Sequence, residues 1–306
     1  MKIMVFDVGG TEIKYSVMDE QMHRTDSGAV PTPQDTQAQF LDAVYRLYAP
    51  HKDEVSGIAM ALPGFVDNRT GYVSNGGALL YNTATPVGQL LAEKCGCPVI
   101  LENDGKAAAM AELANGALKV CGNAAVVSIG TGVGGGIIAN GQLVRGVHFT
   151  AGEYSFVNTN AEAWDAPDQN MACQCSTSNL LKWYRARKAL PEDAPLDGRS
   201  FFAAANAGEP EALEVLRRFC HAVAVQIYNL TVLLDVEKVA IGGGISKQPL
   251  LLESLRSAYN GLYASRAGQA YMEGLPRCQI VPCAFSSEAN QVGVAAAYFE
   301  AMQKKR

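Results

Sequence analysis

Long apolar runs and blocks of charge of one sign are both scarce in this 306-residue sequence. The apolar run after Lys2 ends at Asp7, which is too short for the core of a signal peptide, and no later run is long enough to span a bilayer. Basic residues gather only at 304–306, and the net charge is −5. These absences disfavour membrane and nucleic-acid partners and predict a cytoplasmic protein.

Cysteine is too sparse for a secreted disulfide scaffold, because eight cysteines are spread over the whole chain. We therefore expect reduced thiols. Hydrophobic residues make up 48% and charged residues 18%, as in ordinary globular proteins. A chain of this length exceeds one comfortable hydrophobic core, so two lobes with a cleft between them are predicted.

Alternating apolar residues predict two strands, 2–7 and 13–17, joined by the turn Gly9-Gly10-Thr11. A similar pattern begins at 123, where a strand, a glycine turn and a second strand are followed by an Asn140-Gly141 hairpin turn. This weak internal repeat suggests two lobes that open in the same way. Apolar spacing predicts helices at 36–50, 105–116, 209–234 and 289–302, whereas residues 160–200 are expected to be less regular.

Three glycine turns follow predicted strands, at 9–11, 130–132 and 242–244. Glycine lets backbone N–H groups converge on a phosphate without side chains in the way. No turn matches the Walker pattern, and the first lies in a hairpin rather than at the start of a helix, so P-loop and dinucleotide folds are disfavoured. The turns instead favour a nucleotide held by two related lobes, as in sugar kinases, actin and Hsp70.

Five motifs together resemble the ROK family of sugar kinases and repressors: "FDVGGTEIK", "ALPGFVD", "LENDGKAAAMAE", "IGTGVGGGI" and "IGGGIS". The resemblance implies an α/β, two-lobed fold of the actin, hexokinase and Hsp70 type (ribonuclease H-like), with the active site in the interlobe cleft. It implies a smaller lobe of residues 1–115 and 289–306 and a larger lobe of residues 116–288. ATP, Mg²⁺ and a homodimer are further expectations.

The resemblance also implies the roles of individual residues. Asp104 would be the catalytic base, and sugar binding would involve Gly64, Asn103, Asp104 and Glu153. Nucleotide binding would involve Asp7, Gly9, Gly10, Thr11, Lys14, Thr131, Gly132, Gly243 and Gly244. Asp7 would also lie near Mg²⁺, through water.

The chemistry of Asp104 agrees with that role, because a sugar hydroxyl is a poor nucleophile at neutral pH and needs a carboxylate to take its proton. The alternative is that Asp104 only caps the Ala-rich helix that follows it. Both roles can coexist.

The sequence departs from the family where zinc-bearing members carry Glu-x-Gly-His and then three cysteines. Glu153 is present, but Ser155 and Phe156 replace the glycine and histidine, and Leu180 stands at the third cysteine. Cys173 and Cys175 alone cannot complete a tetrahedral structural zinc site. We therefore expect no zinc, although the substitution of His148 or Cys121 as a ligand stays open.

These departures bear on the substrate, because the family's histidine and a second glutamate, here near Lys182, also contact the sugar. An open anomeric side would admit a β-glucoside or an N-acylated amino sugar, as in zinc-free β-glucoside and N-acetylmannosamine kinases. The alternative is that Phe156 packs into the core behind Glu153. The sequence thus predicts an ATP-dependent sugar kinase that phosphorylates a hydroxyl, with O6 favoured, of a hexose or hexose derivative.

Two non-enzymatic readings compete with this prediction. A ROK repressor would carry a winged helix before the first glycine turn, and Asp7 leaves no room for one. An ATP-binding assembly or chaperone protein would explain the glycine turns but not Asp104 or Glu153 in their motifs.

Overall fold

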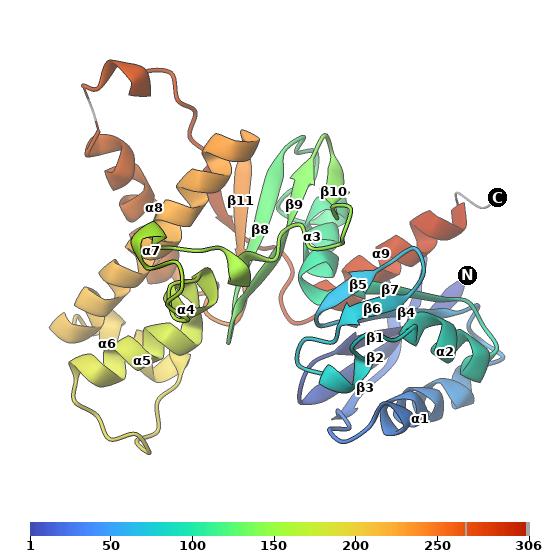
Figure 1. The fold of residues 1–306 in the computed structure, drawn as a ribbon. Helices are drawn as coiled ribbons and strands as arrows, with labels where there is room; N and C mark the ends of the chain where they lie inside the picture. Colours follow the sequence, from blue (N-terminus) through green and yellow to red (C-terminus); the bar gives the residue numbers. More distant parts are fainter. Residues whose placement is uncertain (267, 304–306) are drawn as a thin grey trace. The chain divides into compact units, whose positions relative to one another are not determined.

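The computed structural model describes residues 1–266 and 268–303, which divide into two compact units (Figure 1). Unit 1 contains Met1–Gly116, Leu143–Ala151 and residues 287–303. Unit 2 contains Ala117–Gln142 and Gly152–Ser286. Unit 1 is therefore built from three segments of the chain. The middle segment, Leu143–Ala151, ends two residues before Glu153.

A five-stranded sheet forms the centre of unit 1, in the order β3-β2-β1-β4-β7. Its strands are β1 (Lys2–Val8), β2 (Glu12–Asp19), β3 (Arg24–Pro31), β4 (Ile58–Leu62) and β7 (Val99–Asn103). The predicted hairpin is present as β1 and β2, while β1, β4 and β7 run parallel. Unit 1 also contains β5 (Phe65–Asp67), β6 (Tyr72–Asn75), α1 (Gln37–Tyr48), α2 (Val87–Cys95), α3 (Asp104–Asn115) and α9 (Ala289–Gln303).

Alternation along β1 divides the core of unit 1 between two faces. Met4, Phe6 and Val8 join the hydrophobic cluster that contains residues of α1 and α2. Ile3 and Val5 are equally buried but outside that cluster, as expected when successive side chains point to opposite faces. Helix α9 packs against β1 and β4, so the sheet is covered by helices.

Unit 2 repeats this plan, with a sheet in the order β10-β9-β8-β11-β12. Its strands are β8 (Ala124–Ile129), β9 (Val133–Ala139), β11 (Lys238–Gly242), β12 (Gln279–Pro282) and β10 (Gln142–Val144), of which Leu143 and Val144 are counted with unit 1. Its helices are α4 (Met171–Cys175), α5 (Thr177–Arg187), α6 (Gly198–Asn206), α7 (Pro210–Leu234) and α8 (Pro249–Ala264). Both sheets thus join an antiparallel hairpin to parallel strands, and the internal repeat expected from the sequence is present.

The expectation that residues 160–200 would be less regular was wrong for residues 171–187, which contain α4 and α5. Helix α5 buries only Leu180 and Tyr184, so its apolar stripe is too narrow to stand out in the sequence. Ser176 caps the helix by accepting from the Asn179 N–H at 3.2 Å. Tertiary packing and capping, rather than a strong pattern, establish this helix.

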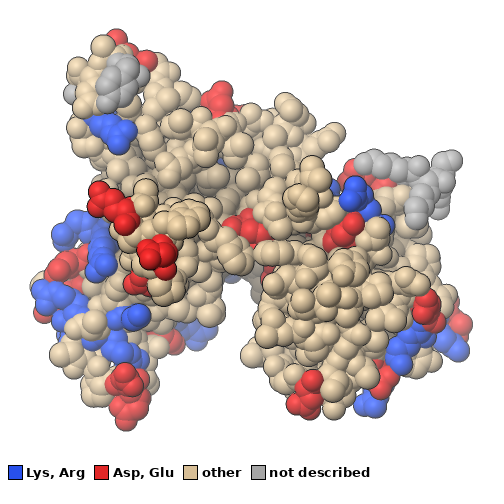
Figure 2. Space-filling model, viewed as in Figure 1, with Lys and Arg blue, Asp and Glu red and all other residues tan. Residues whose placement is uncertain are grey.

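The visible surface mixes charges of both signs. On the face of the described residues in Figure 2, basic and acidic side chains are interspersed over the helices. Across residues 1–266 and 268–303, no helix combines the length and the apolar character that crossing a bilayer requires.

Helices α3 and α9 cross closely at Gly293. A Cβ atom built on Gly293 would lie 1.7 Å from the backbone oxygen of Ala107, which is far inside van der Waals contact. The obstacle is helix backbone, so it cannot turn aside as a side chain could. Only glycine lets α9 come this near to α3.

We predict that Gly293→Ala lowers the free energy of unfolding by about 2–3 kcal/mol, because α9 must move away from α3 and repack the core. Denaturant titration measures this loss. Gly261→Ala in α8 is the matched control, since a Cβ there meets nothing within 4 Å; it should leave stability equal or slightly higher. Equal stability of both variants would contradict the tight crossing.

Candidate functional site

The carboxyl ends of β1, β4 and β7 form one edge of the unit 1 sheet, because the three strands are parallel. Asp7 pairs with Ala61, and Ala61 pairs with Glu102, so these residues stand in one row across the sheet. Two strand spacings place the backbones of β1 and β7 roughly 10 Å apart. The predicted residues Asp7, Asn103 and Asp104 therefore share this edge.

Asp7 is surrounded by polar partners. Its Oδ1 accepts from Asn290 Nδ2 at 2.9 Å, and Lys14 is its cross-strand neighbour on β2. Burial raises the pKa of Asp7 above its ordinary value, while the Asn290 hydrogen bond and the Lys14 charge oppose that rise. A single carboxylate with a nearby cation suits outer-sphere contact with a Mg²⁺ that is bound mainly by phosphates.

The first glycine turn is braced through its carbonyl groups. Thr32 Oγ1 donates to Gly9 O at 2.8 Å, and Gln34 Nε2 donates to Gly10 O at 2.7 Å. The Gly9 N–H donates to Glu12 O across the hairpin. These contacts hold the turn that carries the predicted residues Gly9, Gly10 and Thr11.

Asn103 joins the end of β7 to the start of α3. Its Oδ1 accepts from the Lys106 N–H at 3.0 Å, so Asn103 is the N-cap residue of α3. Its Nδ2 donates to Gly64 O at 2.9 Å and to Asp104 Oδ1 at 3.1 Å. The two predicted sugar-binding residues Gly64 and Asn103 are thus brought together, and both amide hydrogens of Asn103 are engaged.

Asp104 is the first residue of α3 rather than its cap. The alternative that Asp104 only caps the helix is therefore wrong, since Asn103 performs that role. Its Oδ1 accepts from the Asn103 amide and from the Gly105 N–H, the latter at 2.7 Å. Two donors on one oxygen fix the orientation of the carboxylate, as a general base requires.

A buried ion pair lies directly behind Asn103. Glu102 is fully buried, and its Oε2 accepts from Arg145 Nε and Nη2, each at 2.8 Å. Its Oε1 accepts from the Asn103 N–H at 3.1 Å. Burial raises the pKa of Glu102, and the charge of Arg145 limits that rise. Arg145 from the middle segment of unit 1 therefore braces the residue that precedes the candidate site.

The second glycine turn, in unit 2, connects β8 to β9. The Gly130 N–H donates to Gly132 O at 3.0 Å and closes the turn. Ser155 Oγ donates to Val133 O at 2.8 Å and accepts from the Val133 N–H at 3.3 Å. Ser155, which departs from the family pattern, thus ties the segment containing Glu153 to the turn that carries Thr131 and Gly132.

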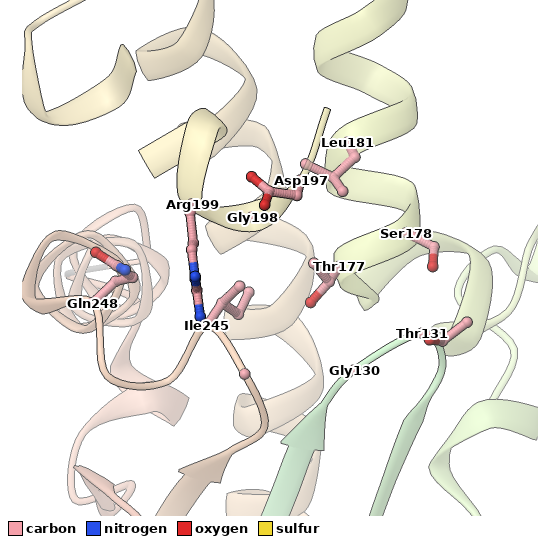
Figure 3. Close-up of a pocket in the computed structure, with 11 residues that line it drawn as sticks. Gly130, Thr131, Thr177, Ser178, Leu181, Asp197, Gly198, Arg199, Ile245 and Gln248 are labelled. Atoms are coloured by element: carbon pink, nitrogen blue, oxygen red, sulfur yellow. The ribbon is translucent and has the colours of Figure 1, made fainter. Parts of the chain in front are cut away.

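A cavity of about 470 Å³ adjoins this turn (Figure 3). It is lined by Gly130, Thr131, Thr177, Ser178, Leu181, Asp197, Gly198, Arg199, Gly244, Ile245 and Gln248. Thr177 and Gly198, the first residues of α5 and α6, and Gln248, the N-cap residue of α8, contribute to its walls. Helix N-termini favour negative charge. The Arg199 side chain extends from α6 toward the loop after β11 (Figure 3). The cavity therefore suits an anionic ligand.

The third glycine turn supplies one wall of that cavity. Gly243 has φ +91°, and a Cβ there would lie 2.0 Å from Ile129 O, so the backbone itself requires glycine. A Cβ on Gly244 would meet nothing within 4 Å, although Gly244 lines the cavity. Glycine at 244 thus leaves space on the ligand side, which fits the close approach of a phosphate.

The zinc region of the family is built differently here. Leu180 is part of the unit 2 core beside Cys175, and burial raises the pKa of Cys175 to about 12. Phe156 is 71% exposed, so the alternative that it packs into the core is wrong. Within the described part of the chain, no group of three or more His, Cys, Asp or Glu residues is placed to hold a metal. The absence of zinc stays a prediction.

Several residues at these sites gave no signal in the sequence. Asn290 resembles any polar residue at a helix start, and Arg145 lies in a loop without a motif. The cavity residues of α5 and α6 fall in the stretch expected to be less regular. The spacing of Asp197 and Ser200, which form a capping box, is a sequence signal for the start of α6.

Comparisons with known proteins agree with the fold and the motifs. The model of the ROK family matches residues 3–303. A β-glucoside kinase of Klebsiella pneumoniae is 31% identical over 259 residues, which cover 84% of this chain and 86% of the relative.

Two solved structures are also similar. One is a ROK family protein from Streptococcus pneumoniae TIGR4 in complex with sucrose, with a TM-score of 0.86, 28% identity, and coverage of 99% of this chain and 100% of that one. The other is a ROK family glucokinase from Streptomyces griseus in complex with glucose and AMPPNP, with a TM-score of 0.80, 25% identity, and coverage of 97% and 99%. The two-lobed α/β fold class predicted from the sequence is confirmed.

We predict that Glu102→Gln lowers the free energy of unfolding by about 3 kcal/mol, because Arg145 loses the carboxylate that compensates its charge. We expect the low end of the usual range, since Arg145 is 27% exposed. Chemical denaturation gives the value. Glu214→Gln is the matched control: its pair with Arg187 is half exposed and should contribute less than about 1 kcal/mol. Similar losses for both variants would show that burial of Glu102 has no special effect.

Proposed function

This chain belongs to the ROK family, and we propose that it is an ATP-dependent sugar kinase acting on a hydroxyl, with O6 favoured, of a hexose, an N-acyl amino sugar or a β-glucoside. The observation that carries the proposal is the Asp104 carboxylate, fixed by two donors on the strand edge that also carries Asp7 and the first glycine turn. Phosphoryl transfer to an alcohol needs a base and a phosphate-binding turn close together, and this edge of the unit 1 sheet carries candidates for both.

The nucleotide is proposed to occupy the unit 2 cavity. Thr131 and Gly244 would contact phosphate groups, while the start of α6, with Asp197 and Arg199, would contact the rest of ATP. Hydrogen bonds from Ser200 hold the pKa of Asp197 below its usual range, so its carboxylate is an acceptor for ligand hydroxyl or amino groups. Three helices begin at this cavity, and their N-termini support the binding of an anionic ligand such as ATP.

In the proposed reaction Asp104 takes the proton of the sugar hydroxyl while the oxygen attacks the γ-phosphorus. The bond from that phosphorus to the bridging oxygen of ADP breaks, and ADP leaves. Lys14 and the N–H groups of Gly10 and Thr11 would offset negative charge on the phosphates. Asp7 would hold Mg²⁺ through water, and the ion would supply positive charge that offsets the charge of the phosphates.

The acceptor would be held by Gly64, Asn103, Asp104 and Glu153. Because the Asn103 amide hydrogens are engaged by Gly64 and Asp104, Asn103 would offer its oxygen to the sugar. Phe156, three residues after Glu153, presents an exposed apolar ring that could stack on a second sugar ring or an acyl group. The β-glucoside kinase relative supports a decorated acceptor. The division into lobes 1–115 with 289–306 and 116–288, a cytoplasmic location and a homodimer remain part of the proposal.

We predict that Asp104→Asn keeps the shape of the site but lowers kcat by about 10²- to 10⁴-fold, the usual contribution of a general base, with little change in KM for ATP. Coupled detection of ADP over a panel of sugars measures this effect. Asp67→Asn, which alters a carboxylate that binds the Arg69 N–H at a turn, is the control and should keep its turnover. An Asp104→Asn variant with most of its turnover would sink the assignment of Asp104 as the base.

We predict that Phe156→His reduces the preference for a β-glucoside or an acylated amino sugar over glucose by about 10- to 200-fold in kcat/KM, because an apolar contact with the decoration is lost. The melting temperature should hold, since Phe156 is exposed. Trp164→His replaces another exposed aromatic residue of unit 2 and should leave the preference unchanged. If both variants show the native preference, Phe156 does not contact the acceptor.

A further inference from the structure

The first two turns of α9 connect three parts of unit 1 that carry candidate site residues. Asn290 Nδ2 donates to Asp7 Oδ1 at 2.9 Å, across 283 positions of the sequence. The neighbouring Gln291 is buried, and its Oε1 accepts from Ser16 Oγ and Arg24 Nη1, each at 3.3 Å. The start of helix α9 is therefore hydrogen-bonded to β1, β2 and β3.

The same turns are pressed against α3. A Cβ on Gly293 would lie 1.7 Å from Ala107 O, so the two helices have no freedom to slide past each other without loss of packing. Ala107 is one turn from Asp104 on α3. The Asn290 amide is therefore held in place from both sides, by the hairpin and by the helix that begins at Asp104.

The Asn290 hydrogen bond is one of two interactions that favour the ionised form of Asp7. Burial disfavours the ionised carboxylate, and Glu12 adds a further negative charge nearby. Lys14 and Asn290 are the groups that oppose these effects. A hydrogen bond to a carboxylate is stronger than one between neutral groups, and it also restricts the rotation of the carboxylate.

We propose that Asn290 is a positioning residue that orients the Asp7 carboxylate toward the hydrated Mg²⁺ of Mg–ATP, an inference that rests on the proposed kinase function. The contact acts through Asp7 and needs no direct contact between Asn290 and the nucleotide. Gln291, one residue further on, instead accepts hydrogen bonds from Ser16 and Arg24 of the sheet. The two adjacent amides thus have different roles: Asn290 orients Asp7, and Gln291 supports the fold.

Calorimetric titration with AMPPNP, in Mg²⁺ and separately in EDTA, tests this proposal on the full chain. For the native protein we expect tighter binding in Mg²⁺ than in EDTA. Asn290→Leu keeps the size but removes the donor, and it should reduce the Mg²⁺-dependent gain in affinity by about 10-fold while affinity in EDTA stays within about twofold. Asn290→Ser, whose hydroxyl is too short to reach Asp7, should act in the same way and replaces the leucine variant if that one does not fold.

Gln291→Leu is the matched control, and it should lower the melting temperature but keep the native ratio of affinities. Steady-state kinetics at low and high Mg²⁺ is a second readout. The kcat of the Asn290 variants should fall at limiting Mg²⁺ and recover in part at high Mg²⁺, while KM for sugar stays unchanged. Asn290 variants with the native ratio of affinities, or with equal losses in Mg²⁺ and EDTA, would overturn the positioning role alone. A native protein that binds no AMPPNP in either solution would overturn the kinase function, and this inference with it.

Discussion

Three parallel strands, β1, β4 and β7, end at one edge of the unit 1 sheet, and the candidate catalytic residues depend on this pairing. The pairing register sets Asp7 and Glu102 in one row, so a shift by one residue would turn their side chains to the opposite face. Because backbone hydrogen bonds maintain the register, the spacing between Asp7 and Asp104 is a property of the sheet rather than of loops. Loops then need only supply the glycine turns.

The sequence alone identifies most of this edge, because its chemistry is local. Glycines after strands, the strand pattern of 2–7 and the Asn103-Asp104 pair are all read within a few residues. Asn290 and Arg145 were not predictable in the same way, since each acquires its role from a contact with a distant part of the chain. A polar residue at the start of a helix is ordinary until its partner is known.

The helices around the unit 2 cavity were missed for a different reason. Helix α5 buries few apolar residues and is stabilised by packing and by its Ser176 cap, so periodicity gave little warning of it. Its position matters because the first turns of α5 and α6 line the cavity. Most residues of α5 and α6 that line the cavity are polar or small. They therefore do not contribute to the apolar periodicity by which helices are recognised in a sequence.

Charged side chains are buried behind the candidate site, which indicates that they serve to position its residues more than to stabilise the fold. Glu102 and Lys106 are both fully buried, and Arg145 is largely so. An apolar set of similar volume would often be as stable or more stable, because charges lose their hydration on burial. A carboxylate, however, can accept from the Asn103 N–H and from Arg145 at once, which an apolar side chain cannot do. Hydrogen bonds are directional, whereas apolar contacts allow many arrangements. The hydrogen bonds of Glu102 therefore set the direction of the chain where β7 turns into α3, and with it the orientation of Asp104.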